Sequence, residues 1–496
     1  MKRYLLAILF VFCVIRCSAS APDYHYTYTE NCRKAYQHYL SLHIADARSC
    51  LLIEIKADPY NLLAVYISDY EDCILLLLNC SKSDLKQRAD HLSEHIDLLD
   101  KGDQSSPWYR FCKAGVYLHW AIINMRFGEQ YNTANYFRKS FALLKENQKL
   151  FPQFEYNNTF FGLEEAVVGS LPGNYKWLAS IFGMKGNVRN GTGKLNAFIG
   201  SHNNNNPFYA ETVLYALYTR FYLLPEQKEV WDFLNSKSFS TNNNLLNTYV
   251  KANLALDLRK SDEAIQILKV ASVDASFGLY PVFDYQMGCA LYNQCDTASA
   301  YYFNSYLKKN KSDLYIKDCW QRMSLIWYLA GDLSKASYCR SQISKNGTAR
   351  IDADKQAQKF VETGIWPNKI LLRSRLLIEA GYYNKAFSTL ATIDNNVLSN
   401  PTDKAEYYFR MGRIYEETDN FSKAIEYYQY TINTGKERHE QFAARAALQM
   451  GKMYERSNKP TPAMQRYKEC LQMPYHDFQN SIDQQAKAGI NRLEGK

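Results

Sequence analysis

The sequence predicts an all-α fold in which helical hairpins stack into a right-handed α-solenoid. Apolar residues recur with a period near 3.6 along most of the 496 residues, and the Val, Ile and Thr alternation typical of strands is nearly absent. Pairs of small residues twelve positions apart also recur along the chain. The first pattern predicts helices, and the second predicts that they pair into a repeated unit.

Composition indicates a folded chain with a large core. Hydrophobic residues make up 47% of the sequence and charged residues 22%, which excludes disorder over most of its length. Aromatic residues make up 15%, with 40 tyrosines. Amphipathic rings suit both packed helices and binding surfaces, so composition does not separate these two uses.

Residues 1–20 have the order of a secretory signal peptide. Lys2 and Arg3 precede an apolar run that ends at Ile15, and small residues follow from Ser18. This run is too short for a stable membrane span. The sequence therefore predicts export, to the periplasm or the cell envelope.

A lipid anchor is the minor alternative. Cleavage before Cys17 would leave that cysteine to be acylated and would attach the protein to a membrane, but Arg16 stands where a small residue is expected. Cleavage after residue 20 removes three basic residues and no acidic one, which lowers the net charge from +9 to +6. Since no block of five Lys or Arg residues occurs, no nucleic-acid partner is predicted.

The cysteines predict no metal site. Of the 12 cysteines none forms a C-x-x-C motif, so neither a zinc site nor a redox motif is indicated. Export would permit disulfides, and Cys32 and Cys50 could face each other across a helical hairpin. Buried free thiols are an equally good interpretation.

Three segments follow the predicted signal peptide. Residues 21–155 are expected to form degenerate hairpins around the pairs Ala35 with Ala47 and Ile122 with Ala134. Residues 156–206 form a non-repeat helical insert with a glycine-rich loop. Residues 207–496 hold the regular array, with six pairs: Ala252 with Ala264, Gly288 with Ala300, Ser324 with Ala336, Ser374 with Ala386, Gly412 with Ala424, and Gly451 with Ala463. Residues 346–368, between the third and fourth of these units, are expected to be an inserted turn and loop.

This spacing resembles the tetratricopeptide repeat (TPR), a helix-turn-helix unit of about 34 residues. Small residues are needed where its two helices cross, because larger side chains would force them apart. Around Gly412 and Ala424, large residues fill the other apolar positions, among them Tyr408, Tyr415 and Tyr428. The resemblance implies a helical repeat protein.

The insert resembles a second motif. Its residues match the central segment of a TPR family of mitochondrial outer-membrane and inclusion-body-clearance proteins, and a similar segment of exported bacterial TPR proteins. The matching residues are Gly162, Ser170, Leu171, Pro172, Gly183, Gly186, Gly191 and Leu195. We expect its glycines to lie where helices end, in conformations with positive φ. The resemblance implies no catalytic residue.

A phosphate-binding loop at GMKGNVRNGTGKL (183–195) is not supported. Gly193 and Lys194 would require a glycine at 188 and a hydroxyl at 195, where the chain has Val188 and Leu195. Neither this segment nor any other predicts a cofactor.

A zinc peptidase is a remote alternative. HLSEH would place His91 and His95 on one helix face as zinc ligands, with Glu94 as general base and Glu164 or Glu165 as third ligand. The charged surroundings fit a solvated helix equally well, so no enzyme activity is predicted. The helix-like run before this motif contains Asp69, Glu71 and Asp72 and is therefore not expected to span a membrane.

A helical repeat protein of this kind is expected to bind a protein or peptide partner in the concave groove lined by its first helices. The repeat register places seven polar residues toward that groove: Gln321, Arg322, Arg375, Arg410, Arg413, Gln449 and Lys452. Such residues favour an acidic partner.

Two other interpretations stay open. The same residues suit an ordinary solvated surface balanced by nearby acids: Glu379, Glu406, Glu416 and Glu455. A glycan- or peptide-binding protein that uses tyrosines as stacking platforms is an alternative of another class. No oligomeric state follows from the sequence.

Overall fold

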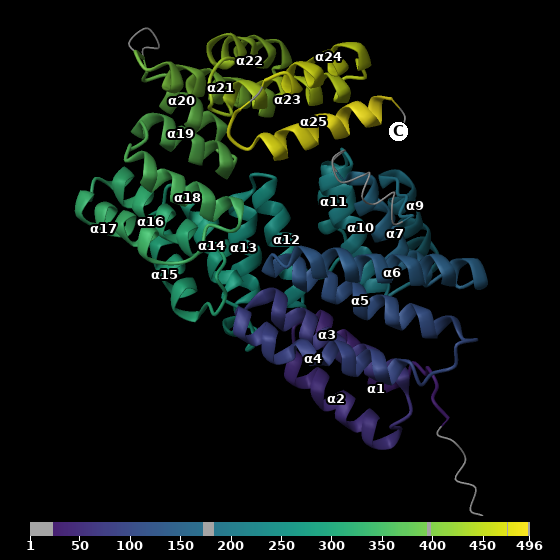
Figure 1. Cartoon of the computed structure of the whole chain (residues 1–496). Helices are drawn as coiled ribbons and strands as arrows, with labels where there is room; N and C mark the ends of the chain where they lie inside the picture. The colour runs from purple at the N-terminus through teal and green to yellow at the C-terminus, as the bar shows by residue number, and fades with distance from the viewer. Residues whose placement is uncertain (1–22, 172–182, 394–397, 474, 495–496) are drawn as a thin grey trace, which may run out of the picture.

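A computed structural model describes residues 23–171, 183–393, 398–473 and 475–494 (Figure 1). The predicted signal peptide, Cys17 and Pro172 lie outside these ranges. Within them the regular structure is helical, and one isolated β-bridge joins His25 and Asn61. The predicted all-α class is therefore confirmed. None of the described helices is long and apolar enough to cross a membrane.

The first part of the chain forms helices up to residue 234. Their bounds are α1 Glu30–Leu40, α2 Ile44–Ala57, α3 Leu62–Leu78, α4 Lys82–Leu99, α5 Pro107–Phe127, α6 Gln130–Leu150, α7 Asn157–Ser170, α9 Val188–Ser201, α10 Tyr209–Leu223 and α11 Gln227–Leu234.

The second part continues the series to the C-terminus. Its bounds are α12 Leu245–Asp257, α13 Ser261–Ala271, α14 Val282–Asn293, α15 Ser299–Lys309, α16 Ile316–Ala330, α17 Leu333–Lys345, α18 Asp352–Thr363, α19 Lys369–Ala380, α20 Tyr383–Leu390, α21 Pro401–Glu417, α22 Phe421–Gly435, α23 Phe442–Arg456, α24 Pro460–Leu471 and α25 Gln479–Leu493.

Consecutive helices pack as antiparallel hairpins along the chain. The pairs α12 with α13, α14 with α15, α16 with α17, α19 with α20, α21 with α22 and α23 with α24 each form one unit. Helix α25 lies against α23 and α24 and covers the last unit (Figure 1). This arrangement confirms the predicted α-solenoid.

The small residues lie where the helices of each hairpin meet, as predicted. A Cβ on Gly412 would lie 2.7 Å from Tyr428 Cδ1, and a Cβ on Gly451 would lie 2.5 Å from Tyr467 Cε1. Ser324 is buried and donates a hydrogen bond to the carbonyl of Ala336 over 2.8 Å. Each hairpin therefore closes only because one helix presents a small surface to the other.

Two expectations about the repeats were wrong. Ala134 is exposed, so it does not form a helix crossing with Ile122. Helices α5 and α6 instead cross where Ser140 donates a hydrogen bond to the carbonyl of Ala114 over 2.8 Å. The expected loop between the third and fourth units contains helix α18, which buries Ala357 and packs on α16 and α17.

The glycines of the insert act mainly through close packing. Gly183 has φ +68, as expected of a helix-ending glycine. Gly186 and Gly191 do not have positive φ, and a Cβ on either would collide with backbone of α7. A Cβ on Gly162 would lie 2.8 Å from the carbonyl oxygen of Gly191. These glycines allow α7 and α9 to approach closely.

The N-terminal helices contact the middle of the array. Tyr280 donates a hydrogen bond to the carbonyl of Leu42 over 2.6 Å, and Arg350 donates one to the carbonyl of Phe127 over 2.8 Å. The described cysteines, Cys32 and Cys50 among them, form no disulfide, which favours the free-thiol interpretation.

Candidate functional site: a cation cluster on the first helices

Six basic side chains line one face built by the first helices of successive hairpins. We call this set the cation cluster: Arg322 on α16, Arg375 on α19, Arg410 and Arg413 on α21, and Arg445 and Lys452 on α23. Five of them were predicted from the repeat register. The predicted residues Gln321 and Gln449 lie half-buried on α16 and α23.

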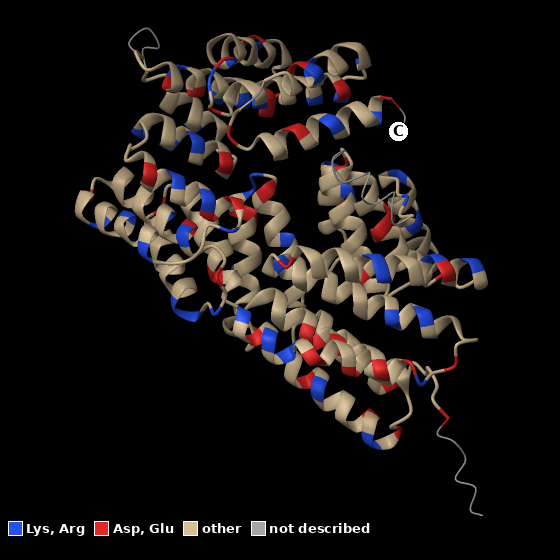
Figure 2. Cartoon of the chain, in the orientation of Figure 1, with Lys and Arg blue, Asp and Glu red and all other residues tan. Residues whose placement is uncertain are grey.

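Arg445 was missed by the sequence prediction. It lies four residues before Gln449 and seven before Lys452, so all three share one face of α23. That spacing was visible in the sequence and would have identified it. Charged residues of both signs are distributed over the helices of the whole chain (Figure 2), so charge alone did not single out this face.

Part of the cluster is neutralised by neighbouring acids. Arg413 is buried, and its guanidinium lies 2.7 Å from Glu416 and 2.7 Å from Glu417. Arg410 pairs with Glu406 over 2.8 Å. The balancing role expected of Glu406 and Glu416 is therefore seen. Arg410 and Arg413 are thus buried and paired within the chain, whereas Arg375 and Arg445 are half-buried.

Glu379 connects several helices electrostatically. Burial would raise the pKa of this carboxyl, but Arg259, Arg413, Arg410 and Arg375 together hold it below its usual range. Arg259, in the turn between α12 and α13, lies 3.7 Å from Glu379 and 3.0 Å from Glu417. The charges of α12, α19 and α21 thus interact across one shared face.

Positive charge remains in excess toward α23. Burial, together with the charge of Arg410, lowers the pKa of Arg445 to about 10. Its Nε atom is buried and has no hydrogen-bond partner among the described residues. Burial and the charge of Arg413 likewise lower the pKa of Lys452 to about 8, and its ammonium donates to Gln485 Oε1 over 2.7 Å. An anion beside α23 would relieve this repulsion.

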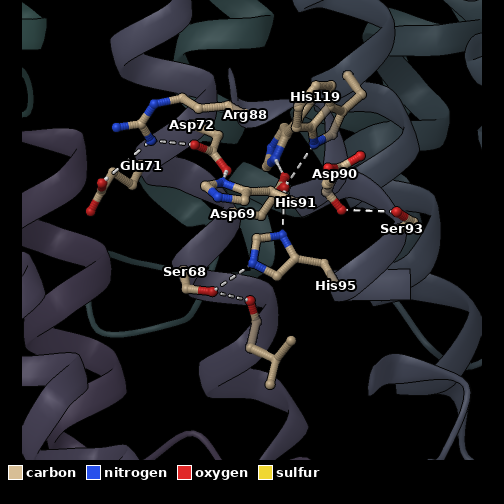
Figure 3. A network of polar contacts seen from close by, with 12 residues as sticks. Ser68, Asp69, Glu71, Asp72, Arg88, Asp90, His91, Ser93, His95 and His119 are labelled. Carbon is tan, nitrogen blue, oxygen red and sulfur yellow. Dashed lines mark hydrogen bonds and ion pairs between the residues drawn. The ribbon is translucent and has the colours of Figure 1, made fainter. Parts of the chain in front are cut away.

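The HLSEH motif lies on α4 and joins a second polar network (Figure 3). His95 Nδ1 lies 3.0 Å from Asp69 Oδ1, and His91 Nδ1 lies 2.8 Å from Asp72 Oδ2. His119 on α5 lies 2.7 Å from the other oxygen of Asp69. Although burial opposes ionisation, the two histidines on Asp69 lower the pKa of its carboxyl to about 2.

The ligands expected for a zinc peptidase are not arranged together. Glu165 forms an ion pair with Lys194 over 2.8 Å, and Glu164 is fully buried, which raises the pKa of its carboxyl well above the usual range. Glu94 is exposed. The acids that face His91 and His95 are Asp69 and Asp72 of α3 instead.

The glycine-rich segment 183–195 offers no phosphate cradle. Gly191, Gly193 and Lys194 lie inside α9, where their amide groups belong to the helix. Lys194 forms an ion pair with Glu165, and its ammonium lies 4.3 Å from the centre of the Phe161 ring.

Comparison with known proteins gives one family match. Residues 405–429 match the model of the tetratricopeptide repeat, and they span most of α21 and the first part of α22. No curated protein matches the sequence.

Three solved structures that are similar to this chain have low sequence identity to it. The TPR domain of P58(IPK) is 14% identical over 87% of this chain and 97% of its own, with a TM-score of 0.22. Human IFIT1, in a dimer with m7Gppp-AAAA, is 12% identical over 83% and 91%, with a TM-score of 0.33. The apo quorum sensor NprR from B. thuringiensis is 14% identical over 82% and 97%, with a TM-score of 0.28.

The family match falls on the repeat unit whose small residues, Gly412 and Ala424, are both buried at a helix crossing. The same pairing recurs in the neighbouring hairpins. The chain therefore carries a tetratricopeptide repeat at residues 405–429, within an α-solenoid of similar hairpins.

Proposed function

We propose that this protein is an exported scaffold that binds an acidic segment of a partner protein on the face that carries the cation cluster. The carrying observation is the excess of positive charge on α23, where Arg445 and Lys452 have lowered pKa values and Arg445 Nε has no hydrogen-bond partner among the described residues. Partner carboxylates would pair with these groups, and a guanidinium can bind a carboxylate through two parallel hydrogen bonds.

Stacked hairpins suit this role because they form a continuous surface. The first helices α16, α19, α21 and α23 contribute one or two cations each, so an extended acidic segment could meet several of them in turn. Binding by several moderate contacts is typical of recognition along a repeat array.

The aromatic residues support a ligand-stacking function less well. Many of the close ring pairs join side chains of the N-terminal core, such as Tyr66 with Phe111 and Tyr36 with Phe208. Exposed tyrosines such as Tyr131, Tyr301 and Tyr475 belong to α6, α15 and the segment before α25. They do not share one helix or one hairpin.

Titration with a labelled peptide tests the binding proposal. A short fluorescein-labelled peptide rich in Asp and Glu should bind the mature chain, and the double variant Arg375→Ala with Arg445→Ala should bind it at least about tenfold more weakly. The matched control removes two exposed lysines, Lys335 on α17 and Lys355 on α18, which are not first helices of the cation cluster. Equal losses in both double variants would contradict the proposal.

The export proposal has its own test. Intact-mass analysis of the protein from its native cell should show a mature chain that begins near residue 21, recovered with the envelope fraction. An added acyl mass on Cys17 would establish the lipid-anchor alternative. A chain that keeps Met1 and fractionates with the cytoplasm would overturn export.

A further inference from the structure

We propose that Asp69, Asp72 and His95 form a site for a divalent transition metal ion such as Zn²⁺. One oxygen from each carboxylate and one ring nitrogen of His95 lie within 4.8 Å of one another. Small side-chain movements would let one metal ion contact all three at the usual distance of about 2.0–2.2 Å. Imidazole together with carboxylates is a donor set that suits zinc and its neighbours.

The surroundings of His95 leave one ring nitrogen for a cation. Ser68 Oγ donates its hydrogen to the carbonyl of Val65 over 2.7 Å, so it can only accept at its 3.1 Å contact with His95 Nε2. Nε2 therefore carries a hydrogen, and Nδ1 lies 3.0 Å from Asp69 Oδ1. A metal ion would displace the hydrogen that Nδ1 shares with Asp69 and would take Nδ1 as its ligand.

The two carboxylates are buried and oriented by other side chains. Asp69 is fully buried and accepts hydrogen bonds from His119 Nδ1 over 2.7 Å and Trp120 Nε1 over 3.0 Å. Asp72 accepts from His91 Nδ1 over 2.8 Å and pairs with Arg88. These hydrogen bonds hold the two carboxylates in place, as the outer hydrogen bonds around metal ligands do.

His91, which contacts Asp72, is the exposed edge of this network (Figure 3). His91 lies one helical turn before His95, its ring centre is 6.4 Å from that of His95, and 40% of its side chain is exposed. Arg88 neutralises Asp72 while no ion is bound. An ion would join α3 to α4 and, through Asp69 and His119, to α5. The site would therefore stabilise the N-terminal helices.

This inference departs from the sequence-based expectation of no metal. HLSEH supplied the histidine, but the expected partners Glu164 and Glu165 are replaced by Asp69 and Asp72. A second group, His38, His43 and Asp46, lies nearer the surface, and His43 there pairs with Asp274 over 3.0 Å. It provides a matched control for the experiment.

Zinc titration of the mature, untagged, EDTA-treated chain tests the proposal. One Zn²⁺ should bind per chain, and His95→Ala and Asp72→Asn should each weaken binding at least about a hundredfold, while His43→Ala leaves it unchanged. Ser68→Ala should weaken it by about ten- to a hundredfold, because Nε2 loses its acceptor. Circular dichroism establishes that each variant is folded.

X-ray absorption spectroscopy of the zinc-loaded wild-type chain identifies the ligand atoms without any variant. Only nitrogen and oxygen ligands should appear, at about 2.0–2.1 Å. Sulfur ligands would assign the zinc to cysteines and overturn the proposal. Absence of saturable zinc binding, or its loss in His43→Ala rather than in His95→Ala, would overturn it as well.

Discussion

Glu211 makes the stability of the N-terminal core depend on pH. It lies on α10, is 3% exposed, and accepts hydrogen bonds from the hydroxyl of Tyr70 at 2.8 Å to each oxygen. Burial raises the pKa of its carboxyl from 4.5 to about 8, although the hydroxyls of Tyr70 and Tyr215 oppose this shift. The folded protein therefore keeps a proton that the unfolded chain loses near its ordinary pKa.

The sign and size of the effect follow from this difference. Because the folded pKa is raised, the stabilising contribution is complete below pH 4.5 and is lost as the pH rises through about 8. A shift of about 3.5 pKa units, at about 1.36 kcal/mol each, amounts to a loss on the order of 5 kcal/mol across this range. Substitution Glu211→Gln removes the titration and keeps an acceptor for Tyr70, so it should flatten the pH dependence.

Urea unfolding of the N-terminal helices measures this pH dependence of stability. Amide exchange of α3, pulse-labelled along a urea gradient at pH 5 and at pH 8, would report its local free energy of unfolding. The wild type should be less stable at pH 8 by several kcal/mol than Glu211→Gln, whereas the exposed-residue control Glu263→Gln should follow the wild type. Equal pH dependence in wild type and Glu211→Gln would refute the reasoning.

Three further outcomes are expected. Gly451→Val should destabilise α23 and α24 by about 1–3 kcal/mol, because its Cβ would lie 2.5 Å from Tyr467, and amide exchange there should accelerate, whereas Gly200→Ala in open space should be tolerated. Ser324→Ala should lower the stability of α16 and α17 by about 1 kcal/mol, through the lost hydrogen bond to Ala336, measured by the same exchange. Binding of the acidic peptide should weaken steeply as salt rises from about 0.05 to 0.5 M, and binding independent of salt would contradict a charge-based contact.

The repeat register was predictable because helix crossings restrict residue size. Gly412 and Gly451 each meet a tyrosine ring of the partner helix, and such a restriction leaves a regular trace in the sequence. Helix α18 escaped prediction because Gly347, Gly364 and Pro367 flank it and made the segment resemble a loop. The crossing of α5 and α6 escaped because Ser140 and Ala114 do not keep the twelve-residue spacing.

The polar sites were predictable only in part. Cations that repeat at one register position, such as Arg375 and Arg413, could be assigned to a face from sequence alone. The Asp–His network could not, because Asp69 on α3 meets His95 on α4 and His119 on α5, and no sequence spacing connects the three. Only the packing of those helices brings the side chains together.

Photo-crosslinking in the native cell tests the central claim most directly. A photoreactive residue placed at Gln449, beside Arg445 on α23, is compared with one at Tyr338, which is 61% exposed on the second helix α17. We expect Gln449 to yield a specific adduct with a partner protein, identified by mass spectrometry, and we expect Arg445→Glu to abolish it. Adducts formed from Tyr338 alone, or an adduct at Gln449 that persists in Arg445→Glu, would contradict partner binding at the cation cluster.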